Sequence, residues 1–452
     1  MLFESRNPAT GEVVKTYPSL TKGEIEKGLE RAWTAWKSWS TTGFAQRAAV
    51  LSRMADLLES RVETYAQLIV LEMGKPIGEA RAEVKKAASG CRHYVEAGED
   101  YLKPQPIPGL NARVVYESVG PIFGIMPWNL PFWQVLRFFI PLAMAGSTVL
   151  VKHAETVQGC AAALEQLVRD AGGPDGLYVN FPIAREDVPA VIADARVRGV
   201  TVTGSIPVGR LIARIAGQHG KKAVLELGGS DPFLVFEDAN FDKAVEMGVL
   251  SRYSNNAQSC IAAKRFIVAE SIAPRYVEAF AEKAKALRVG DPMKTETQLG
   301  PLARADIRAN TERQVSGAKA AGAKLVTGGG AIDGPGYYYA PTVMTGLPTT
   351  APLAQEEFFG PVALMFTFKT EQQAIDLANG TEYGLAATVW SADNQRAARV
   401  AARIEAGAVF INDFVRSDPR APFGGVKGSG FGRELGALGA RELTNAKLIF
   451  GG

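Results

Sequence analysis

The chain has 452 residues, of which 47% are hydrophobic and 21% are charged, so it can form about two or three globular domains. Its 50 basic and 47 acidic residues are mixed, which argues against a nucleic-acid-binding surface or a polybasic membrane patch. Three cysteines (Cys91, Cys160 and Cys260) are too few for a disulfide framework and lack zinc-site spacing. We therefore expect no metal site and a reducing, cytoplasmic environment.

The first 120 residues predict short strands followed by helices. Two strands are expected within 3–18, around a turn at Asn7-Pro8-Ala9-Thr10-Gly11. A capping box from Thr21 to Glu24 begins the first helix. Further helical patterns run over 45–73 and 77–98, and 113–119 is typical of an extended strand.

Strands and helices alternate from residue 121 onward. Such alternation predicts a parallel sheet with helices on its faces, and ligands bind beyond the carboxyl ends of its strands. The most apolar part, 135–151, is interrupted by Arg137, Pro141 and Gly146, so a buried helix and strand are expected rather than a membrane span. The expected strands are 121–126, 147–151, 199–202 and 223–227, and the expected helices are 132–145, 156–171 and 206–217.

A second α/β series begins after Gly229. The final segment, 443–450, is extended again, and we expect it to pair with 113–119. The second series predicts strands at 231–236 and 265–268 and helices at 240–254 and 272–287, with further units to about 412.

Cys260 is the strongest candidate for a chemical role. It follows a turn of small polar residues in a chain with few cysteines, which is typical of a nucleophile. The alternative is a small buried hydrophobic side chain. Asn129, fixed between two prolines, is a candidate oxyanion donor or a helix cap. Glu226 ends an apolar run, where a carboxylate can act as a base or form a structural ion pair.

Two glycine-bearing segments are candidates for binding loops. Gly204-Ser205-x-x-x-Gly209 joins a predicted strand to a helix, where free N–H groups can bind phosphate, but the pattern is weak by itself. The segment 428–433 follows no clear strand, so we interpret it as a hinge or interface loop.

Six motifs in chain order resemble the aldehyde dehydrogenase superfamily, over essentially the whole chain. The sequences of 150–154 and 262–266 are most similar to those of the shorter bacterial succinate-semialdehyde dehydrogenases. The motifs are Pro127-Trp128-Asn129-x-Pro131, Thr203-Gly204-Ser205-x-x-x-Gly209, Glu226-Leu227-Gly228-Gly229, Gln258-x-Cys260, Glu357-x-Phe359-Gly360-Pro361 and Pro422-Phe423-Gly424-Gly425-x-Lys427-x-Ser429-Gly430.

The resemblance implies an α/β fold with a Rossmann-like cofactor domain and an α/β catalytic domain. The cofactor domain is expected to comprise 1–104 and 118–228, and the catalytic domain 229–428. A small extended oligomerisation element, 105–117 with 440–452, implies a homodimer or homotetramer.

The resemblance also implies roles for the matching residues. Cys260 attacks an aldehyde, Asn129 holds the oxyanion, and Glu226 activates the water that hydrolyses the resulting thioester. Glu155 favours NAD over NADP, although NADP is possible. The implied cofactor-binding residues are Met126, Pro127, Trp128, Lys152, Glu155, Thr203, Gly204, Ser205, Gly209, Leu227, Gly228, Glu357 and Phe359.

The implied substrate is a small aldehyde with a distal carboxylate, and we expect Arg137, Ser417 and Phe423 to bind it. Relatives that oxidise succinate semialdehyde often use a second arginine, where this chain has Ser254. Arg252, Arg416 or Arg420 could substitute for it. For Arg137 the alternative is an ion pair within its own domain, because it lies in an apolar helix.

One departure from the family pattern and two alternative functions are left open by the sequence. Ala257 replaces the usual glycine before Gln258. A thiol hydrolase would use Cys260 without a dinucleotide, but it would need a partnered histidine, and the histidines lie outside the motifs. A catalytically inactive member of the family would be expected to lack Cys260, Glu226 or Asn129, and all three are present.

Overall fold

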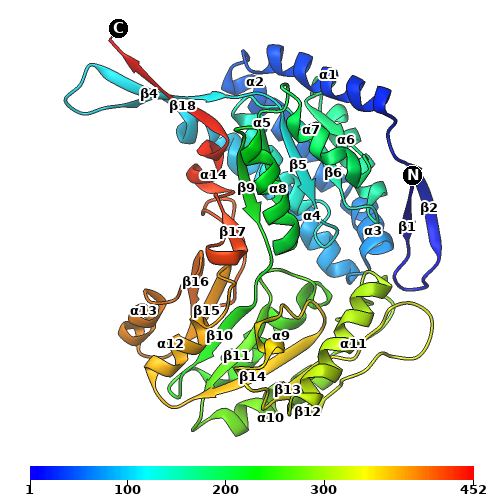
Figure 1. Cartoon of the computed structure of the whole chain (residues 1–452), viewed down its shortest axis with the longest axis vertical. Helices are drawn as coiled ribbons and strands as arrows, with labels where there is room; N and C mark the ends of the chain where they lie inside the picture. The colour runs from blue at the N-terminus through cyan, green and yellow to red at the C-terminus, as the bar shows by residue number, and fades with distance from the viewer. Residues whose placement is uncertain (452) are drawn as a thin grey trace.

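Two parallel sheets covered by helices form the two lobes of the molecule (Figure 1). The computed structural model describes residues 1–451. The first sheet has the order β17-β9-β8-β5-β6-β7. From β5 the chain adds β6 and β7 on one side and then crosses over to add β8 and β9 on the other, so the strand order reverses between β5 and β8. Its parallel strands are β5 (Ile122–Met126), β6 (Val149–His153), β7 (Tyr178–Asn180), β8 (Gly199–Thr203) and β9 (Lys222–Glu226).

Helices surround this first sheet, and their apolar faces pack against it or against one another. The capping box is confirmed, because Thr21 and Glu24 cap each other at the start of α1. The single helical pattern predicted for 45–73 is wrong, because non-helical backbone at Arg61 divides it into two helices. The helices are α1 (Lys22–Trp39), α2 (Phe44–Ser60), α3 (Val62–Met73), α4 (Ile77–Leu102), α5 (Trp133–Met144), α6 (Gln158–Asp170), α7 (Val188–Ala193) and α8 (Ile206–Gln218).

The second sheet has the order β12-β13-β14-β11-β10-β15-β16, and only β12 runs antiparallel to its neighbour. Its strands are β10 (Asp231–Val235), β11 (Ala263–Ala269), β12 (Lys324–Thr327), β13 (Thr342–Thr345), β14 (Val362–Phe368), β15 (Ala386–Trp390) and β16 (Ala408–Ile411). Its helices are α9 (Phe241–Tyr253), α10 (Ala273–Lys285), α11 (Ala305–Ala320), α12 (Glu371–Asn379) and α13 (Asn394–Ala401).

The two sheets meet end to end. β9 ends at Glu226, and the chain passes through 227–230 directly into β10 at Asp231. The carboxyl end of the first sheet therefore faces the amino end of the second. Cys260 lies just before β11, and Glu357 lies just before β14, so both belong to loops at this junction.

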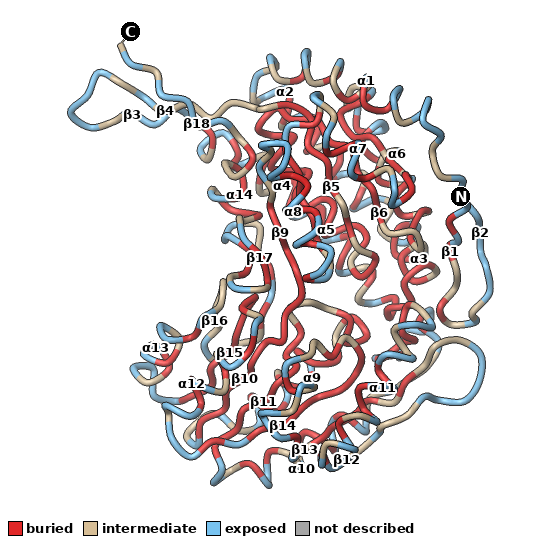
Figure 2. Tube along the Cα trace, in the orientation of Figure 1, coloured by how far each residue is buried: buried red, intermediate tan, exposed pale blue. Residues whose placement is uncertain are grey.

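An extended arm projects from the body in Figure 1. It contains β3 (Gln105–Pro106), β4 (Ala112–Ser118) and the terminal strand β18 (Thr444–Phe450). The predicted pairing is confirmed, because β18 runs antiparallel to β4 from Thr444 opposite Ser118 to Phe450 opposite Ala112. Figure 2 shows that much of this arm is exposed.

The C-terminal part of the chain also returns to the first lobe. β17 (Gly430–Phe431) pairs antiparallel with β9, and α14 (Gly436–Glu442) follows it. The segment predicted as a hinge or interface loop is therefore partly a sheet edge within the chain. At the N-terminus, β1 (Leu2–Arg6) and β2 (Val13–Pro18) form a hairpin, as predicted. No helix within residues 1–451 is long and apolar enough to cross a bilayer.

Candidate active site

The loop that carries Cys260 has an unusual backbone. Three consecutive residues before it, Asn255, Asn256 and Ala257, have φ angles of 56°, 54° and 62°. Left-handed backbone costs an L-residue about 1–2 kcal/mol, although asparagine adopts it more readily than most. Tertiary hydrogen bonds hold this backbone in place. The side-chain nitrogen of Asn256 donates to the Gly74 and Pro301 carbonyls, both at 2.8 Å.

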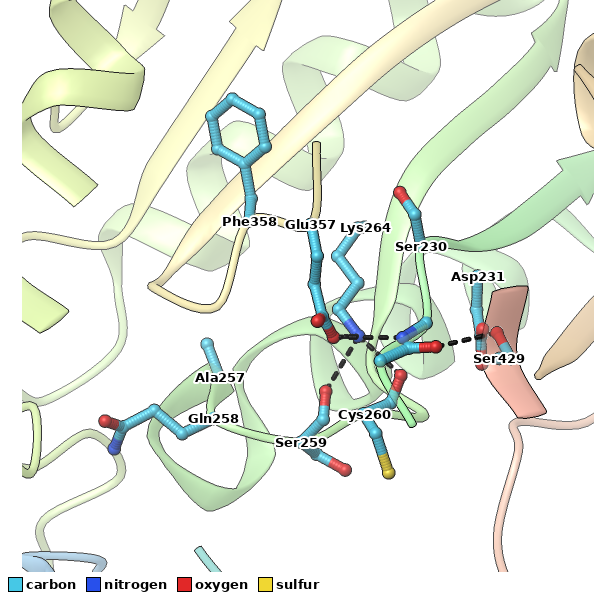
Figure 3. Close-up of polar contacts among 12 residues, drawn as sticks. Ser230, Asp231, Ala257, Gln258, Ser259, Cys260, Lys264, Glu357, Phe358 and Ser429 are labelled. Atoms are coloured by element: carbon cyan, nitrogen blue, oxygen red, sulfur yellow. Dashed lines mark hydrogen bonds and ion pairs between the residues drawn. The ribbon is translucent and has the colours of Figure 1, made fainter. Parts of the chain in front are cut away.

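Lys264 fixes the same loop from the other side. Its buried ammonium donates to the Ser259 carbonyl at 2.8 Å and to the Cys260 carbonyl at 2.5 Å, and it pairs with Glu357 at 3.3 Å (Figure 3). The Cys260 sulfur lies on the side of the loop away from this ammonium in Figure 3. Lys264 therefore orients Cys260 through the backbone and leaves the thiol free.

Burial raises the pKa of the Cys260 thiol to about 11, although the charges of Arg137 and Lys264 oppose this shift. The thiol is consequently protonated at neutral pH. Because the thiolate is the reactive form, the site needs a base to remove its proton.

Asn129 lies against residues 255–260, the loop that carries Cys260. The side-chain nitrogen of Asn129 donates to the backbone carbonyl of Gln258 at 3.0 Å. The backbone carbonyl of Asn129 accepts from the side-chain nitrogen of Asn255 at 3.0 Å. An amide nitrogen carries two hydrogens, so one donor remains for a second acceptor. Asn129 and the loop are thus held as one rigid unit, which suits a donor that must not reorganise during a reaction.

Glu226 is buried at the carboxyl end of β9. Neither of its carboxylate oxygens has a hydrogen-bond partner among the described residues. Burial raises its pKa well above the usual value, Glu434 raises it further, and Arg137 and Arg433 oppose the shift. A carboxyl group with both oxygens free and a raised pKa is a stronger base than an ordinary carboxylate, which suits a role in proton transfer.

A cavity of about 710 Å³ lies at the carboxyl ends of β5, β6 and β8, where the strand order reverses. This is the place at which dinucleotides bind in such sheets. It is lined by eight of the predicted cofactor residues, Met126, Pro127, Trp128, Lys152, Glu155, Thr203, Gly204 and Ser205, and also by Arg185 and Arg304.

The chemistry of this cavity fits a dinucleotide. The hydroxyl of Thr203 is buried without a hydrogen-bond partner, and the N-terminus of α8 follows it. The side chain of Ser205 does not cap that helix, so free backbone N–H groups are available to a phosphate.

The other five predicted cofactor residues do not line this cavity. Gly209 and Leu227 pack together, since a Cβ at Gly209 would lie 2.4 Å from the Leu227 side chain. Gly228 similarly allows Glu357 to approach closely, because a Cβ at Gly228 would lie 2.3 Å from the Glu357 Oε2 atom. Phe359, from the second lobe, meets the ring of Trp128 at 5.8 Å and so joins the two lobes beside the cavity.

Arg185 is a cavity residue that the sequence analysis missed. It donates two hydrogen bonds to the Glu155 carboxylate, at 2.9 Å and 3.3 Å. No sequence motif connects the two residues, which lie on different loops. Glu155 is therefore a paired carboxylate and not an isolated negative charge.

The residues predicted to bind substrate are held by other side chains. Arg137 forms a buried ion pair with Glu434, which was the open alternative, and its guanidinium stacks on the Phe423 ring at 4.4 Å. The Ser417 oxygen accepts from Lys86 at 2.8 Å and from the Trp133 indole at 3.0 Å. Lys86 carries no signal in the sequence that distinguishes it from a surface lysine.

None of the three arginines considered as substitutes is uncommitted. Arg252 is fully buried, and its guanidinium donates to backbone carbonyls that include Phe358 at 3.1 Å. Arg416 pairs with Asp413 at 2.7 Å, and Arg420 pairs with Asp418 at 2.6 Å. Arg252 therefore anchors the loop that carries Cys260, and the other two arginines pair within their own loop.

No histidine within residues 1–451 hydrogen-bonds to Cys260. The His153 ring instead contacts the Pro131 carbonyl at 2.9 Å and the Ala154 N–H at 3.0 Å, and His93 contacts Tyr101 at 3.0 Å. The partnered histidine that a thiol hydrolase would need is not found among these contacts.

Comparison with known proteins decides the family. Residues 1–449 match the model of the aldehyde dehydrogenase family. The chain belongs to this family. It is an NAD(P)-dependent oxidoreductase, as the motifs predicted.

Similar aldehyde dehydrogenases are known from several bacteria. A probable succinate-semialdehyde dehydrogenase [NADP+] of Synechocystis sp. is 45% identical over 100% of both chains. A succinate semialdehyde dehydrogenase [NAD(P)+] of Escherichia coli is 44% identical over 99% of this chain and 97% of its own. The crystal structure of a succinic semialdehyde dehydrogenase from Streptococcus pyogenes with NADP+ has a TM-score of 0.97 at 37% identity, covering 99% of both chains.

Proposed function

We propose that this aldehyde dehydrogenase oxidises succinate semialdehyde to succinate, with NAD or NADP as the hydride acceptor. The contact of Asn129 with the loop that carries Cys260 and the unpartnered buried carboxyl of Glu226 support the aldehyde chemistry, and the names of the relatives support the substrate.

The first step requires the Cys260 thiolate. Glu226 removes the thiol proton, and the sulfur then bonds to the aldehyde carbon, which turns the carbonyl oxygen into an oxyanion. The remaining Asn129 N–H and the Cys260 backbone N–H stabilise this oxyanion. The nicotinamide ring supplies a hydride acceptor, and loss of hydride from the carbon leaves a thioester on Cys260.

Glu226 also serves the second step. After it has lost its proton to solvent, it takes a proton from water, and the hydroxide attacks the thioester carbon. The carbon–sulfur bond breaks, Cys260 is regenerated, and the carboxylic acid leaves. Aldehyde, water and oxidised cofactor are thus converted to acid, reduced cofactor and a proton.

The cofactor is assigned to the 710 Å³ cavity. Lys152 and Glu155 would face the adenosine ribose, the α8 N-terminus with Ser205 the pyrophosphate, and Glu357 with Phe359 the nicotinamide half. The domains are assigned as 1–104 with 118–228 for cofactor binding and 229–428 for catalysis. The arm is assigned to homo-oligomer formation and the enzyme to the cytoplasm.

A substrate panel tests the proposal. Reduced cofactor is followed by absorbance with succinate semialdehyde and with butanal, a neutral aldehyde of equal carbon number, and with NAD and NADP. We expect a higher kcat/KM for succinate semialdehyde with at least one cofactor. Cys260→Ala should abolish turnover and still bind cofactor. Equal or better use of butanal by the wild type contradicts the proposed substrate, and turnover by Cys260→Ala contradicts the mechanism.

A further inference from the structure

The charge that is free to meet a substrate carboxylate belongs to Lys86 and not to Arg137. Arg137 is neutralised by its buried ion pair with Glu434. No carboxylate of residues 1–451 lies within ion-pairing distance of the Lys86 ammonium, which rests on Ser417 at 2.8 Å and over the Trp133 ring at 4.9 Å. Lys86 is half-buried on α4, so its position is defined by these contacts.

The carboxylates nearest to Lys86 are bound to other groups. Glu83 pairs with Lys75 at 2.5 Å and accepts the backbone N–H groups of Phe132 and Trp133 at 2.8 Å and 3.0 Å. Asp418 is held by Arg420. Lys86 therefore has an uncompensated charge in a partly buried position, which is costly unless an anion or solvent compensates it.

Hydrogen-bond counting shows which kind of ligand fits. The Ser417 oxygen accepts from both Lys86 and Trp133, which occupies its two lone pairs, so its O–H can only donate. The Lys86 ammonium has two further N–H donors, and the buried Nη2 of Arg137 has no partner. A cluster with spare donors and no spare acceptor matches a carboxylate, which only accepts.

The cluster adjoins a cavity that extends toward Glu226. Ser417 and Phe423 line a cavity of about 300 Å³ that extends to Gly424. Gly424 borders Glu226, since a Cβ there would lie 2.8 Å from the Glu226 Oε1 atom. Trp133 and Arg137 are one helical turn apart on α5, so they occupy the same face beside this cavity.

We propose that Lys86, with the Ser417 hydroxyl, binds the distal carboxylate of the semialdehyde and takes the place of the arginine missing at Ser254. The inference rests on the proposed function, because it assumes an acidic aldehyde. Arg137, held by Glu434 and Phe423, then adds its unpartnered Nη2 as a further donor to the same subsite.

Lys86→Met tests the proposal, because methionine keeps the length of the side chain and removes the charge. We expect kcat/KM for succinate semialdehyde to fall roughly 10–100-fold, mainly through KM, as for a lost charge-assisted hydrogen bond. The value for butanal should stay within about threefold, which also shows that the variant is folded. Lys85→Met, at the adjacent exposed position of α4, is the matched control and should change neither.

Binding of the product provides a readout without turnover. Succinate titrated calorimetrically into the wild type and into Lys86→Met should bind roughly 10–100-fold more weakly to the variant. Equal affinity in the two proteins overturns the role of Lys86, whichever aldehyde the wild type prefers. A wild type that prefers butanal instead overturns the proposed function. Equal losses of kcat/KM on both aldehydes would assign Lys86 a purely structural role.

The pH dependence of the unmodified enzyme is a third readout. Burial lowers the pKa of Lys86 to about 8; Arg137 and Arg416 lower it too, whereas Glu83 and Asp418 raise it. A lysine is uncharged above its pKa, so the preference for succinate semialdehyde over butanal should fall as pH rises through about 8. Cys260 and Glu226 act on both substrates and cancel in this ratio. A ratio that is flat with pH in the wild type contradicts the proposal.

Discussion

At the scale of single residues, the nucleophile loop combines an unfavourable backbone with strong anchoring. Ala257 is the residue least suited to its conformation, because it has a φ of 62° and lacks the local hydrogen bonding that helps asparagine. It is also fully buried, so the space around its Cβ is limited. The replacement of the usual glycine is therefore tolerated because the surrounding contacts fix the loop.

Substitutions at Ala257 should separate backbone strain from side-chain packing. Ala257→Val adds a branched Cβ at positive φ in a packed site, and we expect a loss of about 2 kcal/mol or more. Ala257→Gly relieves the strain but adds unfolded-state entropy, so we expect a change within about 1 kcal/mol. Thermal unfolding of both variants measures this. A Val variant as stable as the wild type would mean that the loop has a different backbone.

Glu226→Gln should slow both formation and hydrolysis of the thioester, and hydrolysis the more, because the thiol can also lose its proton to solvent. Glutamine cannot accept a proton, and a general base contributes about 10²–10⁴-fold. We expect a burst of reduced cofactor near one equivalent per site, followed by slow turnover, in a stopped-flow experiment. Because the pKa of Glu226 is raised by burial, wild-type turnover should rise as pH increases and this carboxyl loses its proton. Unimpaired steady-state turnover in the variant would remove Glu226 from the mechanism.

The residues that we propose to react could be recognised in the sequence, and the residues that contact them could not. Cys260, Glu226 and Asn129 stand in local motifs whose chemistry can be recognised by residue type. Lys264 and Lys86 act through contacts made only after folding, with a backbone carbonyl in one case and with Ser417, over three hundred positions away, in the other. The sequence left Arg137 open between substrate binding and an ion pair, because its partner, Glu434, is similarly remote in the chain.

At the scale of elements, the alternation of strands and helices was sufficient to predict both parallel sheets. Periodicity failed where a boundary depends on one residue, as at Arg61, and where a strand is too short to have a pattern, as in β17. The boundaries of β6 also differ from the prediction: the strand is expected over 147–151, with Lys152 at its end, whereas β6 runs from Val149 to His153. Lys152 nevertheless lines the cofactor cavity, because this end of the strand opens on it.

The pair of Glu155 and Arg185 joins two loops at the cofactor cavity and should govern the choice of cofactor. Glu155 repels a 2′-phosphate, whereas Arg185 can bind one when released. We expect Glu155→Ser to increase the affinity for NADPH about tenfold or more, measured by fluorescence titration, with NADH affected little or weakened.

Arg185→Gln provides the control for this prediction. In the Glu155→Ser background it should remove most of the gained NADPH affinity, because the neutral side chain cannot pair with a phosphate. If the double variant retains the full gain, the effect comes only from the loss of Glu155, and Arg185 has no part in phosphate binding.

At the scale of the whole molecule, the arm exposes a strand edge and apolar side chains that no other part of residues 1–451 covers. β18 lies at the edge of its sheet, which leaves one side of the strand unpaired. Leu448 and Phe450 are 58% and 72% exposed on it. Exposed apolar side chains on an unpaired edge strand are characteristic of a surface that pairs with another chain.

Leu448→Asp should therefore weaken the homo-oligomer without unfolding the subunit. A charge at an apolar contact between chains must be desolvated on association, which disfavours it. We expect light scattering after size-exclusion chromatography to show a smaller mass for the variant than for the wild type, with the circular dichroism spectrum unchanged. Leu2→Asp, at a residue 65% exposed on the N-terminal hairpin, is the matched control and should leave the mass unaltered. An unchanged mass in Leu448→Asp, or a monomeric wild type, would contradict the assignment of the arm to assembly.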